Sequence, residues 1–217
     1  DSIKAIQRSN CGCKIGIISV SIFLYADDII LIAPTVSALQ NLLNLCEAHL
    51  VQLDMSLNSN KSVCLRIGSR FKEECSPLTT LSGDSLCWVD NVRYLGIYIV
   101  AAKKFSISIS NNKHSFYRSC NAISSKVGHC ASEEVVVKLI SAKCLPVFTY
   151  GLDACPVSAA HRRTLDFVCT RTLMRIFKTS SVDITTECQL RFNFRNFSDI
   201  VNRRKRMFLY KFINCDK

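Results

Sequence analysis

The feature that most constrains this chain is an apolar run over residues 22–33, interrupted by the adjacent carboxylates Asp27 and Asp28. The residues on either side favour β structure, and each apolar arm has the length of a strand. The sequence therefore predicts a β-hairpin, buried on at least one face, with both carboxylates exposed where the chain reverses. Two like charges side by side are costly unless a cation lies beside them.

A divalent cation is the natural candidate for that position, because hard carboxylate oxygens suit Mg²⁺. Mg²⁺ usually takes one or two carboxylates and leaves its other positions to water and substrate phosphates, as in two-metal nucleotidyl transfer. The alternative is a solvated turn, since aspartate is a common turn residue.

The string Tyr25-Ala26-Asp27-Asp28 between hydrophobic strands resembles the catalytic hairpin of the reverse transcriptase palm. The continuation over residues 33–40 is similar to reverse transcriptases of non-LTR (LINE-type) retrotransposons rather than to the retroviral kind. The resemblance implies an RNA-directed DNA polymerase in which Asp27 and Asp28 hold Mg²⁺, with Mn²⁺ as a substitute. It also implies that Tyr25 and Ala26 lie by the primer terminus, whose 3′-hydroxyl attacks the α-phosphate of a dNTP.

Two later segments extend the resemblance. Lys61 matches a lysine near the incoming triphosphate, where it can neutralise or protonate the leaving pyrophosphate. Tyr94, Leu95 and Gly96 resemble the hairpin that holds the primer end, and Gly96 would let a nucleic-acid backbone or a neighbouring strand come close. The alternatives are a solvated loop lysine and an ordinary aromatic-rich strand.

An amphipathic helix is expected between the hairpin and Lys61. Ser37 and Gln40 suggest a capping box, and apolar residues recur at intervals of three and four from position 39 to position 53. This spacing predicts a helix packed on the sheet, with Glu47 on its solvent-facing side.

After about residue 104, helical patterns replace strand patterns and basic residues accumulate. Residues 1–108 hold 10 Lys/Arg and 9 Asp/Glu, whereas residues 109–217 hold 18 and 8. This asymmetry indicates a polyanionic partner, with a solvated basic surface as the alternative. The region resembles a polymerase thumb, which holds a primer–template duplex through its phosphates. The candidate nucleic-acid-binding residues on its helices are Arg162, Arg163, Arg171, Arg175, Arg203, Arg204, Lys205 and Arg206.

We therefore predict an α+β chain with two domains. Residues 1–104 would be the C-terminal part of a palm, made of antiparallel hairpins with a packed helix, and residues 105–217 an all-helical, basic, thumb-like domain. The resemblance implies a further catalytic aspartate and a Gly-rich segment before the hairpin, and the chain begins at Asp1 without an initiator methionine. We expect a fragment that does not polymerise alone.

The expected partners are an RNA template with a DNA primer, the RNA–DNA duplex they form, a dNTP, and the N-terminal fingers and palm of the same polyprotein. A non-catalytic nucleic-acid-binding remnant of such an element is the alternative, and an unrelated metal-dependent phosphohydrolase is a third class.

Composition indicates the cellular setting. No apolar run approaches the length of a membrane span, and we expect no signal peptide, since nothing at the amino end resembles one. Its 13 cysteines have scattered spacings, which favours reduced, mostly buried thiols; zinc is the alternative, although Cys11 and Cys13 are the only close pair. We expect an intracellular protein of the nucleus and cytoplasm, since the basic cluster 203–206 is also consistent with nuclear targeting.

Overall fold

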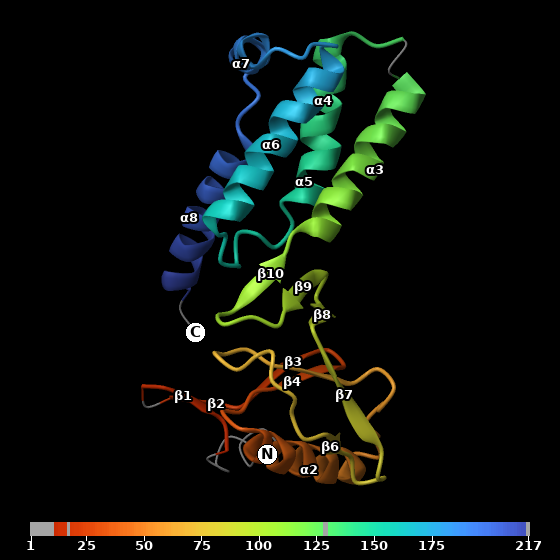
Figure 1. Ribbon diagram of the computed structural model, residues 1–217, viewed down its shortest axis with the longest axis vertical. Helices are drawn as coiled ribbons and strands as arrows, with labels where there is room; N and C mark the ends of the chain where they lie inside the picture. The colour runs from red at the N-terminus through yellow and green to blue at the C-terminus, as the bar shows by residue number, and fades with distance from the viewer. Residues whose placement is uncertain (1–10, 17, 128–129, 216–217) are drawn as a thin grey trace. The chain divides into compact units, whose positions relative to one another are not determined.

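The computed structural model describes residues 11–16, 18–127 and 130–215. The chain divides into two compact units (Figure 1). The strand-rich unit comprises the residues up to Val92 together with Ala101–Lys104, and the helical unit comprises Arg93–Val100 together with Phe105–Lys217. The mixed α+β class is confirmed. The assignment of residues 1–104 and 105–217 to palm and thumb stays a prediction.

The described part of the strand-rich unit contains short strands and one long helix, α2 (Val36–Gln52). The strands are β1 (Cys13–Ile15), β2 (Ile18–Val20), β3 (Ile22–Tyr25), β4 (Asp28–Leu31), β5 (Val63–Leu65), β6 (Leu78–Thr79) and β7 (Ser85–Val89). The pairs β1–β2, β3–β4 and β6–β7 are antiparallel, as expected of hairpins.

One strand pair departs from the expected hairpins. β5 pairs with β7 in parallel, with Val63 opposite Cys87 and Leu65 opposite Val89, so the small sheet has the order β5-β7-β6. The long connection between β5 and β7 allows this geometry, because parallel neighbours need a crossover rather than a tight turn. The expectation of antiparallel hairpins alone is therefore wrong here.

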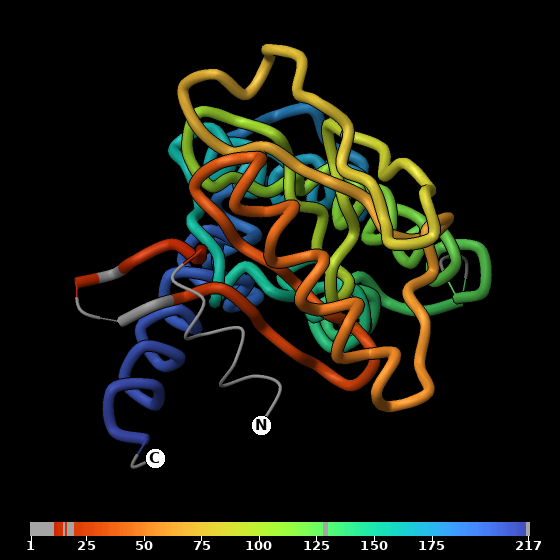
Figure 2. The backbone as a smooth tube through the Cα atoms, turned by 90° about the horizontal axis from the view of Figure 1, so that it is seen from below, coloured from red at the N-terminus to blue at the C-terminus, as the bar shows by residue number. Residues whose placement is uncertain are grey.

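Helix α2 runs alongside the strands of its unit (Figure 2), and apolar residues on one face of the helix pack against them. Leu42, Leu43 and Cys46 are buried, and Leu43 packs with Leu78 and other apolar residues of the β5-β7-β6 sheet. The helix begins two residues earlier than the expected capping box, because Thr35 is the N-cap residue and its hydroxyl accepts a hydrogen bond from the Ala38 amide at 3.1 Å. The capping box at Ser37 and Gln40 is therefore wrong.

Two polar side chains of α2 attach the helix to the chain around β6. Gln40 donates to the Thr79 carbonyl at 2.6 Å and accepts from the Thr79 amide at 2.9 Å. Glu47 is 8 % exposed, and its Oε2 accepts a hydrogen bond from the Leu81 amide at 3.0 Å. Glu47 therefore does not face solvent as expected; it supplies the acceptor that a partly buried backbone amide requires.

The helical unit contains a small sheet followed by a bundle of helices. Its strands are β8 (Asn91–Tyr94), which begins in the other unit, β9 (Ile97–Val100) and β10 (Ser106–Ser108), in the order β10-β9-β8. Its helices are α3 (Ser110–Val127), α4 (Glu133–Leu139), the π-helical turn η1 (Ile140–Cys144), α5 (Leu145–Phe148), α6 (Ala159–Ile176), α7 (Val182–Arg191) and α8 (Phe197–Ile213).

The expectation of an all-helical region from residue 105 is wrong at β10. Ile107 of β10 pairs antiparallel with Ile99 of β9 and joins the helical core, where it is 2 % exposed. Farther along, η1 widens the helix just before Pro146. A proline has no amide hydrogen and its ring collides with the preceding turn, so a π-helical turn lets the chain continue without a break.

Three phenylalanines form the centre of the helical core. Phe116 of α3, Phe148 of α5 and Phe197 of α8 are each 0 % exposed. Their ring centroids lie 5.0 to 5.6 Å apart, within the range of favourable aromatic pairs. Since the rings come from three helices, this cluster joins the first and last helices of the unit.

Gly151 is a position where the helical unit requires a glycine. Its φ is +71°, and a Cβ there would collide with the Ile97 side chain, 2.7 Å from Cγ1. We expect Gly151→Ala to lower the free energy of unfolding by about 2 kcal/mol or more, because backbone strain and overpacking add. Urea denaturation measures this change.

Gly83→Ala is the matched control for Gly151→Ala. Gly83 also has a positive φ, +90°, but nothing lies within 4 Å of its added Cβ. Its substitution should cost only the backbone strain, about 1 kcal/mol. Equal losses in the two variants would contradict the proposed collision with Ile97.

Candidate active site and nucleic-acid interface

The two carboxylates lie at the tip of the hairpin predicted for residues 22–33. β3 and β4 pair antiparallel, with Tyr25 opposite Asp28, which leaves Ala26 and Asp27 as the two loop residues. Ala26 has φ +52°, a left-handed conformation that costs a non-glycine residue about 1 kcal/mol. Tyr25, Ala26, Asp27 and Asp28 are all exposed. The tip therefore presents both carboxylates to solvent, as the sequence indicated.

The arms of this hairpin are less buried than expected. Phe23, Leu24 and Tyr25 are 50 %, 46 % and 61 % exposed, and they alternate between the two faces of β3. Only the base of the hairpin is covered, where Ile22 and Leu31 pack against residues of α2. The expectation of a buried face is wrong near the tip, since β3 and β4 pair only with each other in the described residues.

The donor atoms at the tip fit Mg²⁺ as two of its ligands. Aspartate carboxylates are the hard oxygen ligands that Mg²⁺ prefers, and it completes its shell with water or phosphate oxygens. Across the described ranges, no three His, Cys, Asp or Glu side chains gather closely enough to hold a metal. Cys11 and Cys13, the candidates for zinc, are therefore not part of such a group of three ligands. Asp27 and Asp28 are thus two exposed carboxylates that could serve as a pair of metal ligands.

Lys61 lies in the loop that connects α2 to β5. Its backbone amide donates to the carbonyl and to the side-chain Oδ1 of Asn58, both at 3.2 Å, which fixes the turn, and Lys61 is exposed. The ion pairs found among the described residues are Arg70–Glu73, Lys138–Glu134 and Arg191–Glu187. No ion pair therefore brings Lys61 together with Asp27 or Asp28.

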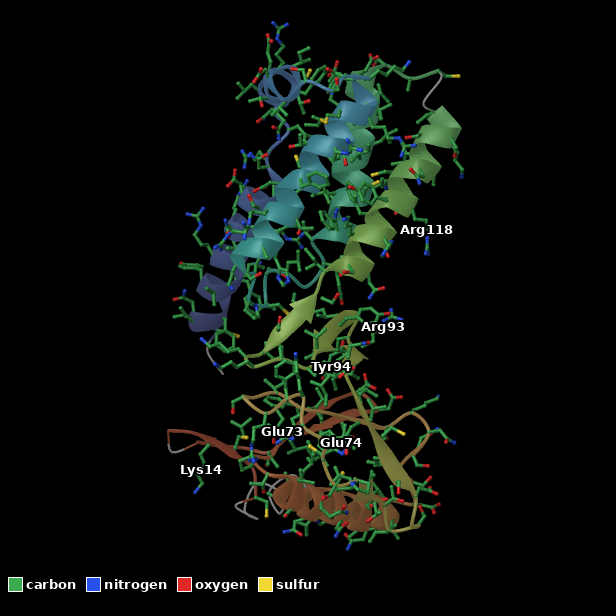
Figure 3. The ribbon with its side chains drawn as sticks, in the orientation of Figure 1. Lys14, Glu73, Glu74, Arg93, Tyr94 and Arg118 are labelled. Carbon is green, nitrogen blue, oxygen red and sulfur yellow. The ribbon has the colours of Figure 1, made fainter. Side chains whose placement is uncertain are left out.

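The segment Tyr94-Leu95-Gly96 forms the turn between β8 and β9 and belongs to the helical unit. Leu95 and Gly96 have positive φ values of +46° and +81°. Tyr150 lies against this turn: its hydroxyl donates to the Leu95 carbonyl at 3.1 Å, and a Cβ on Gly96 would lie 3.0 Å from its ring. The close approach that Gly96 permits is thus made by Tyr150. Figure 3 shows Arg93 and Tyr94 on β8.

The four candidate arginines of α6 do not form one stripe. All four are exposed, and Arg171 and Arg175 are four residues apart, which places them on one side of the helix. Arg162 precedes Arg171 by two and a half helical turns and therefore faces the opposite side. The helix thus presents at least two separate basic surfaces.

The basic cluster of α8 divides into two pairs. Arg204 donates to the hydroxyl of the buried Thr149 at 2.6 Å, and Lys205 donates to the Cys155 carbonyl at 3.1 Å. These two side chains fasten α8 to the segment between α5 and α6. Arg203 and Arg206 are exposed, and no hydrogen bond or ion pair within the described residues occupies them. They are the members of the cluster that make no internal hydrogen bond and are therefore free to contact a polyanion.

Six of the 13 cysteines are buried, so the expectation of mostly buried thiols is wrong, and the expectation of reduced thiols stays a prediction. Burial raises the pKa of Cys169 to about 12 and that of Cys64 to about 11. A thiol with a raised pKa is protonated at neutral pH, and a protonated thiol is neither a nucleophile nor a metal ligand. These two cysteines therefore serve packing rather than chemistry.

A pocket lined by residues of the helical unit was missed by the sequence analysis. Tyr117 of α3, Arg171, Met174 and Arg175 of α6, and Thr179 line a pocket of about 420 Å³. Arg171 and Arg175 had been singled out for their charge. Nothing in the sequence around Tyr117 or Thr179 indicates a pocket, because these residues line it only when α3 packs beside α6.

Comparison with known proteins supports the resemblance for the first part of the chain. Residues 2–99 match a family model described as reverse transcriptase (RNA-dependent DNA polymerase). The matched segment contains the β3–β4 hairpin, Lys61 and the Tyr94–Gly96 turn, and it ends before the helices of the helical unit. No curated protein and no solved structure matches the chain.

The likeness of residues 2–99 to reverse transcriptases is thereby confirmed. A nucleic-acid template and primer are the partners that this likeness implies. In the part of the chain that the structure describes, no helix is long and apolar enough to cross a membrane.

Proposed function

We propose that this chain is part of the RNA-directed DNA polymerase of a non-LTR retrotransposon. The observation that carries the proposal is the exposed Asp27-Asp28 pair at the tip of an apolar hairpin, inside the segment that matches reverse transcriptases. The strand-rich unit would supply the later part of the palm, and the helical unit a thumb. The fingers and earlier palm strands would come from the same polyprotein.

Asp27 and Asp28 would hold Mg²⁺, and Mn²⁺ as a substitute. When bound, the cation neutralises negative charge on the reacting phosphates and lowers the pKa of a coordinated hydroxyl. The two aspartates provide the carboxylate oxygens, and Tyr25 and Ala26 present the adjoining backbone and ring to the primer terminus. Lys61 supplies a cation on a solvent-exposed loop for the triphosphate of the dNTP.

The helical unit would hold the RNA–DNA duplex through its backbone phosphates. Exposed arginines without carboxylate partners suit this role, because phosphate contacts fix the position of a duplex without reading its sequence. Arg162, Arg163, Arg203 and Arg206 are exposed residues of this kind. Arg93 on β8 and Arg118 on α3 are further exposed cations of the same unit (Figure 3).

A primer-extension assay tests the proposed activity. We propose that residues 1–217 alone do not extend a DNA primer on an RNA template with Mg²⁺ or Mn²⁺. The same residues joined to the upstream part of their reading frame should extend it. Template-dependent synthesis by the isolated chain would contradict the first statement, and its absence from the extended protein would contradict the second.

The salt dependence of duplex binding tests the thumb assignment. We expect the double variant Arg203→Gln/Arg206→Gln to bind an RNA–DNA duplex more weakly, with the slope of log K against log salt reduced by about 2, since each phosphate contact contributes about 0.9. Fluorescence anisotropy at several salt concentrations measures this slope.

Arg204→Gln is the control within the same cluster. It removes the same charge but breaks the hydrogen bond to Thr149, so it should lower the thermal stability of the protein and change the salt slope less than either of the other two substitutions. A slope that is unchanged in the double variant would contradict the assignment of Arg203 and Arg206 to a duplex.

The alternative is a non-catalytic nucleic-acid-binding remnant, which would bind nucleic acid through the same basic helices as the polymerase but would not catalyse nucleotide transfer. Like the polymerase, it predicts salt-dependent duplex binding that is unaffected by Asp27→Ala. Unlike the polymerase, it predicts no primer extension by the extended protein. For the polymerase we propose a location in the nucleus and cytoplasm, where its template and target would be found.

A further inference from the structure

The pocket lined by α3 and α6 combines basic, aromatic and apolar side chains. Its volume, about 420 Å³, lies within the range of small-ligand pockets and is much larger than one phosphate group requires. Figure 1 shows α4 between α3 and α6, and α4 packs against both. The pocket itself is lined by residues of α3, of α6 and of the segment just after α6.

One wall of the pocket is cationic. Arg171 and Arg175 line it from adjacent turns of α6. The Arg175 guanidinium donates to Asn121 Oδ1, which holds that side chain toward α3. Among the described residues neither arginine has a carboxylate within ion-pair distance, and no acidic residue lines the pocket. The wall thus carries two positive charges that no described carboxylate balances.

Helix α3 contributes an aromatic ring to the pocket, and α6 also contributes a thioether. Tyr117 packs on the helical core and contacts the edge of Phe116, with ring centroids 5.7 Å apart, so its ring is held in place where it lines the pocket. Burial raises the pKa of Tyr117, and the charge of Arg171 opposes that rise, which indicates that the two side chains are close. Met174 adds an apolar surface beside them.

Thr179 adds a hydroxyl at the rim. Its backbone amide donates to the Met174 carbonyl at 3.0 Å, and its hydroxyl oxygen accepts from the Ser181 amide at 3.2 Å. The hydroxyl hydrogen is left available for an acceptor in the pocket. Arg118 projects from α3 but does not line the pocket (Figure 3).

We propose that this pocket binds one unstacked nucleotide of a single-stranded nucleic acid. Arg171 and Arg175 contact its phosphate, because a pair of guanidinium groups matches phosphate oxygens. The base lies against Tyr117 and Met174, since aromatic rings stack on bases without reading sequence. A paired base within a duplex cannot enter such a pocket. The proposal rests on nucleic-acid binding by the helical unit and adds a preference for an unpaired strand at this one position.

The experiment compares two ligands on the chain of residues 1–217. Fluorescence anisotropy measures the affinity for a labelled single-stranded 12-mer DNA of mixed sequence and for a blunt RNA–DNA duplex of the same sequence, at one ionic strength. We expect Arg171→Gln/Arg175→Gln to weaken single-strand binding at least about tenfold more than duplex binding.

Arg162→Gln/Arg163→Gln is the matched control. It removes the same charge from the same helix but outside the pocket, so it should weaken both ligands by similar factors. Equal losses for the two ligands in the pocket variant would show that the pocket does not select an unpaired nucleotide, and the inference would be wrong.

Substitutions of Tyr117 test the contribution of base stacking without changing the charge of the pocket. Tyr117→Leu removes the ring and should weaken single-strand binding about tenfold with little change in duplex affinity, whereas Tyr117→Phe keeps the ring and should bind as the unaltered chain does. Circular dichroism confirms that the variants are folded. If Tyr117→Leu is folded and binds normally, the ring does not contact a base and the inference fails.

Two further outcomes distinguish this inference from the proposed function. Single-strand binding that depends on the pocket, without any duplex binding, would support the pocket and contradict the thumb assignment. Adenosine monophosphate, which offers a single nucleotide, should compete only weakly with the strand. Tighter binding of the free nucleotide than of the strand would identify a free-nucleotide site and overturn our inference.

Discussion

Replacing Asp27 with asparagine is expected to reduce template-dependent nucleotide incorporation by about a thousandfold or more in the protein extended through its upstream reading frame. The substitution keeps the shape of the side chain and removes the charge that would hold Mg²⁺ against substrate phosphates, and losses of this size follow from removing one electrostatic contact to the transition state. Primer extension at saturating dNTP concentration measures the effect. Duplex affinity should change little, because the phosphate contacts are assigned to the helical unit.

Asp54→Asn is the matched control for this prediction. Asp54 is an exposed carboxylate of the same unit, just after α2, with φ +57°, a conformation that asparagine also adopts readily. Its variant should extend primers at the normal rate. Equal rates of primer extension by the Asp27→Asn and Asp54→Asn variants would contradict a catalytic role of the hairpin.

The second large effect concerns stability. Phe116→Ala should lower the free energy of unfolding of the helical unit by about 3 to 5 kcal/mol, the range for truncating a phenylalanine in a packed core. Phe116 is fully buried and contacts the rings of Phe148 and Phe197. Urea denaturation followed by circular dichroism measures the shift, because most helices of the chain belong to this unit.

Phe167→Ala provides the comparison on an exposed site. Phe167 lies on α6 and is 58 % exposed, so its truncation should cost less than about 1 kcal/mol. A similar loss in both variants would mean that the aromatic cluster around Phe116 is not the centre of the core.

The hairpin and the main helices could be predicted from local patterns. The polar break at Asp27 and Asp28 separates two apolar arms of strand length, and a two-residue loop fixes which residues of the arms pair. The intervals of three and four in residues 39–53 located α2. These features depend only on neighbours in sequence, so one chain suffices to find them.

Features that depend on distant partners were missed. Glu47 has the spacing of a solvent-facing residue, and only the Leu81 amide, 34 residues away, explains its burial. The parallel pairing of β5 with β7 could not be predicted from the sequence of either strand, because it depends on how the two strands meet in the fold. Likewise, the four basic residues of the α8 cluster look alike in sequence, although the structure commits Arg204 and Lys205 to internal hydrogen bonds.

The open hairpin has a consequence for the behaviour of the chain in solution. Its apolar side chains near the tip are half exposed and its strands carry no further partner in the described residues, which is the pattern of a segment prone to self-association. Charged residues beside such segments act as gatekeepers against aggregation. Asp27 and Asp28 occupy that position, so we expect the same two carboxylates that are proposed to bind a cation to oppose pairing of this hairpin with a second copy of the chain.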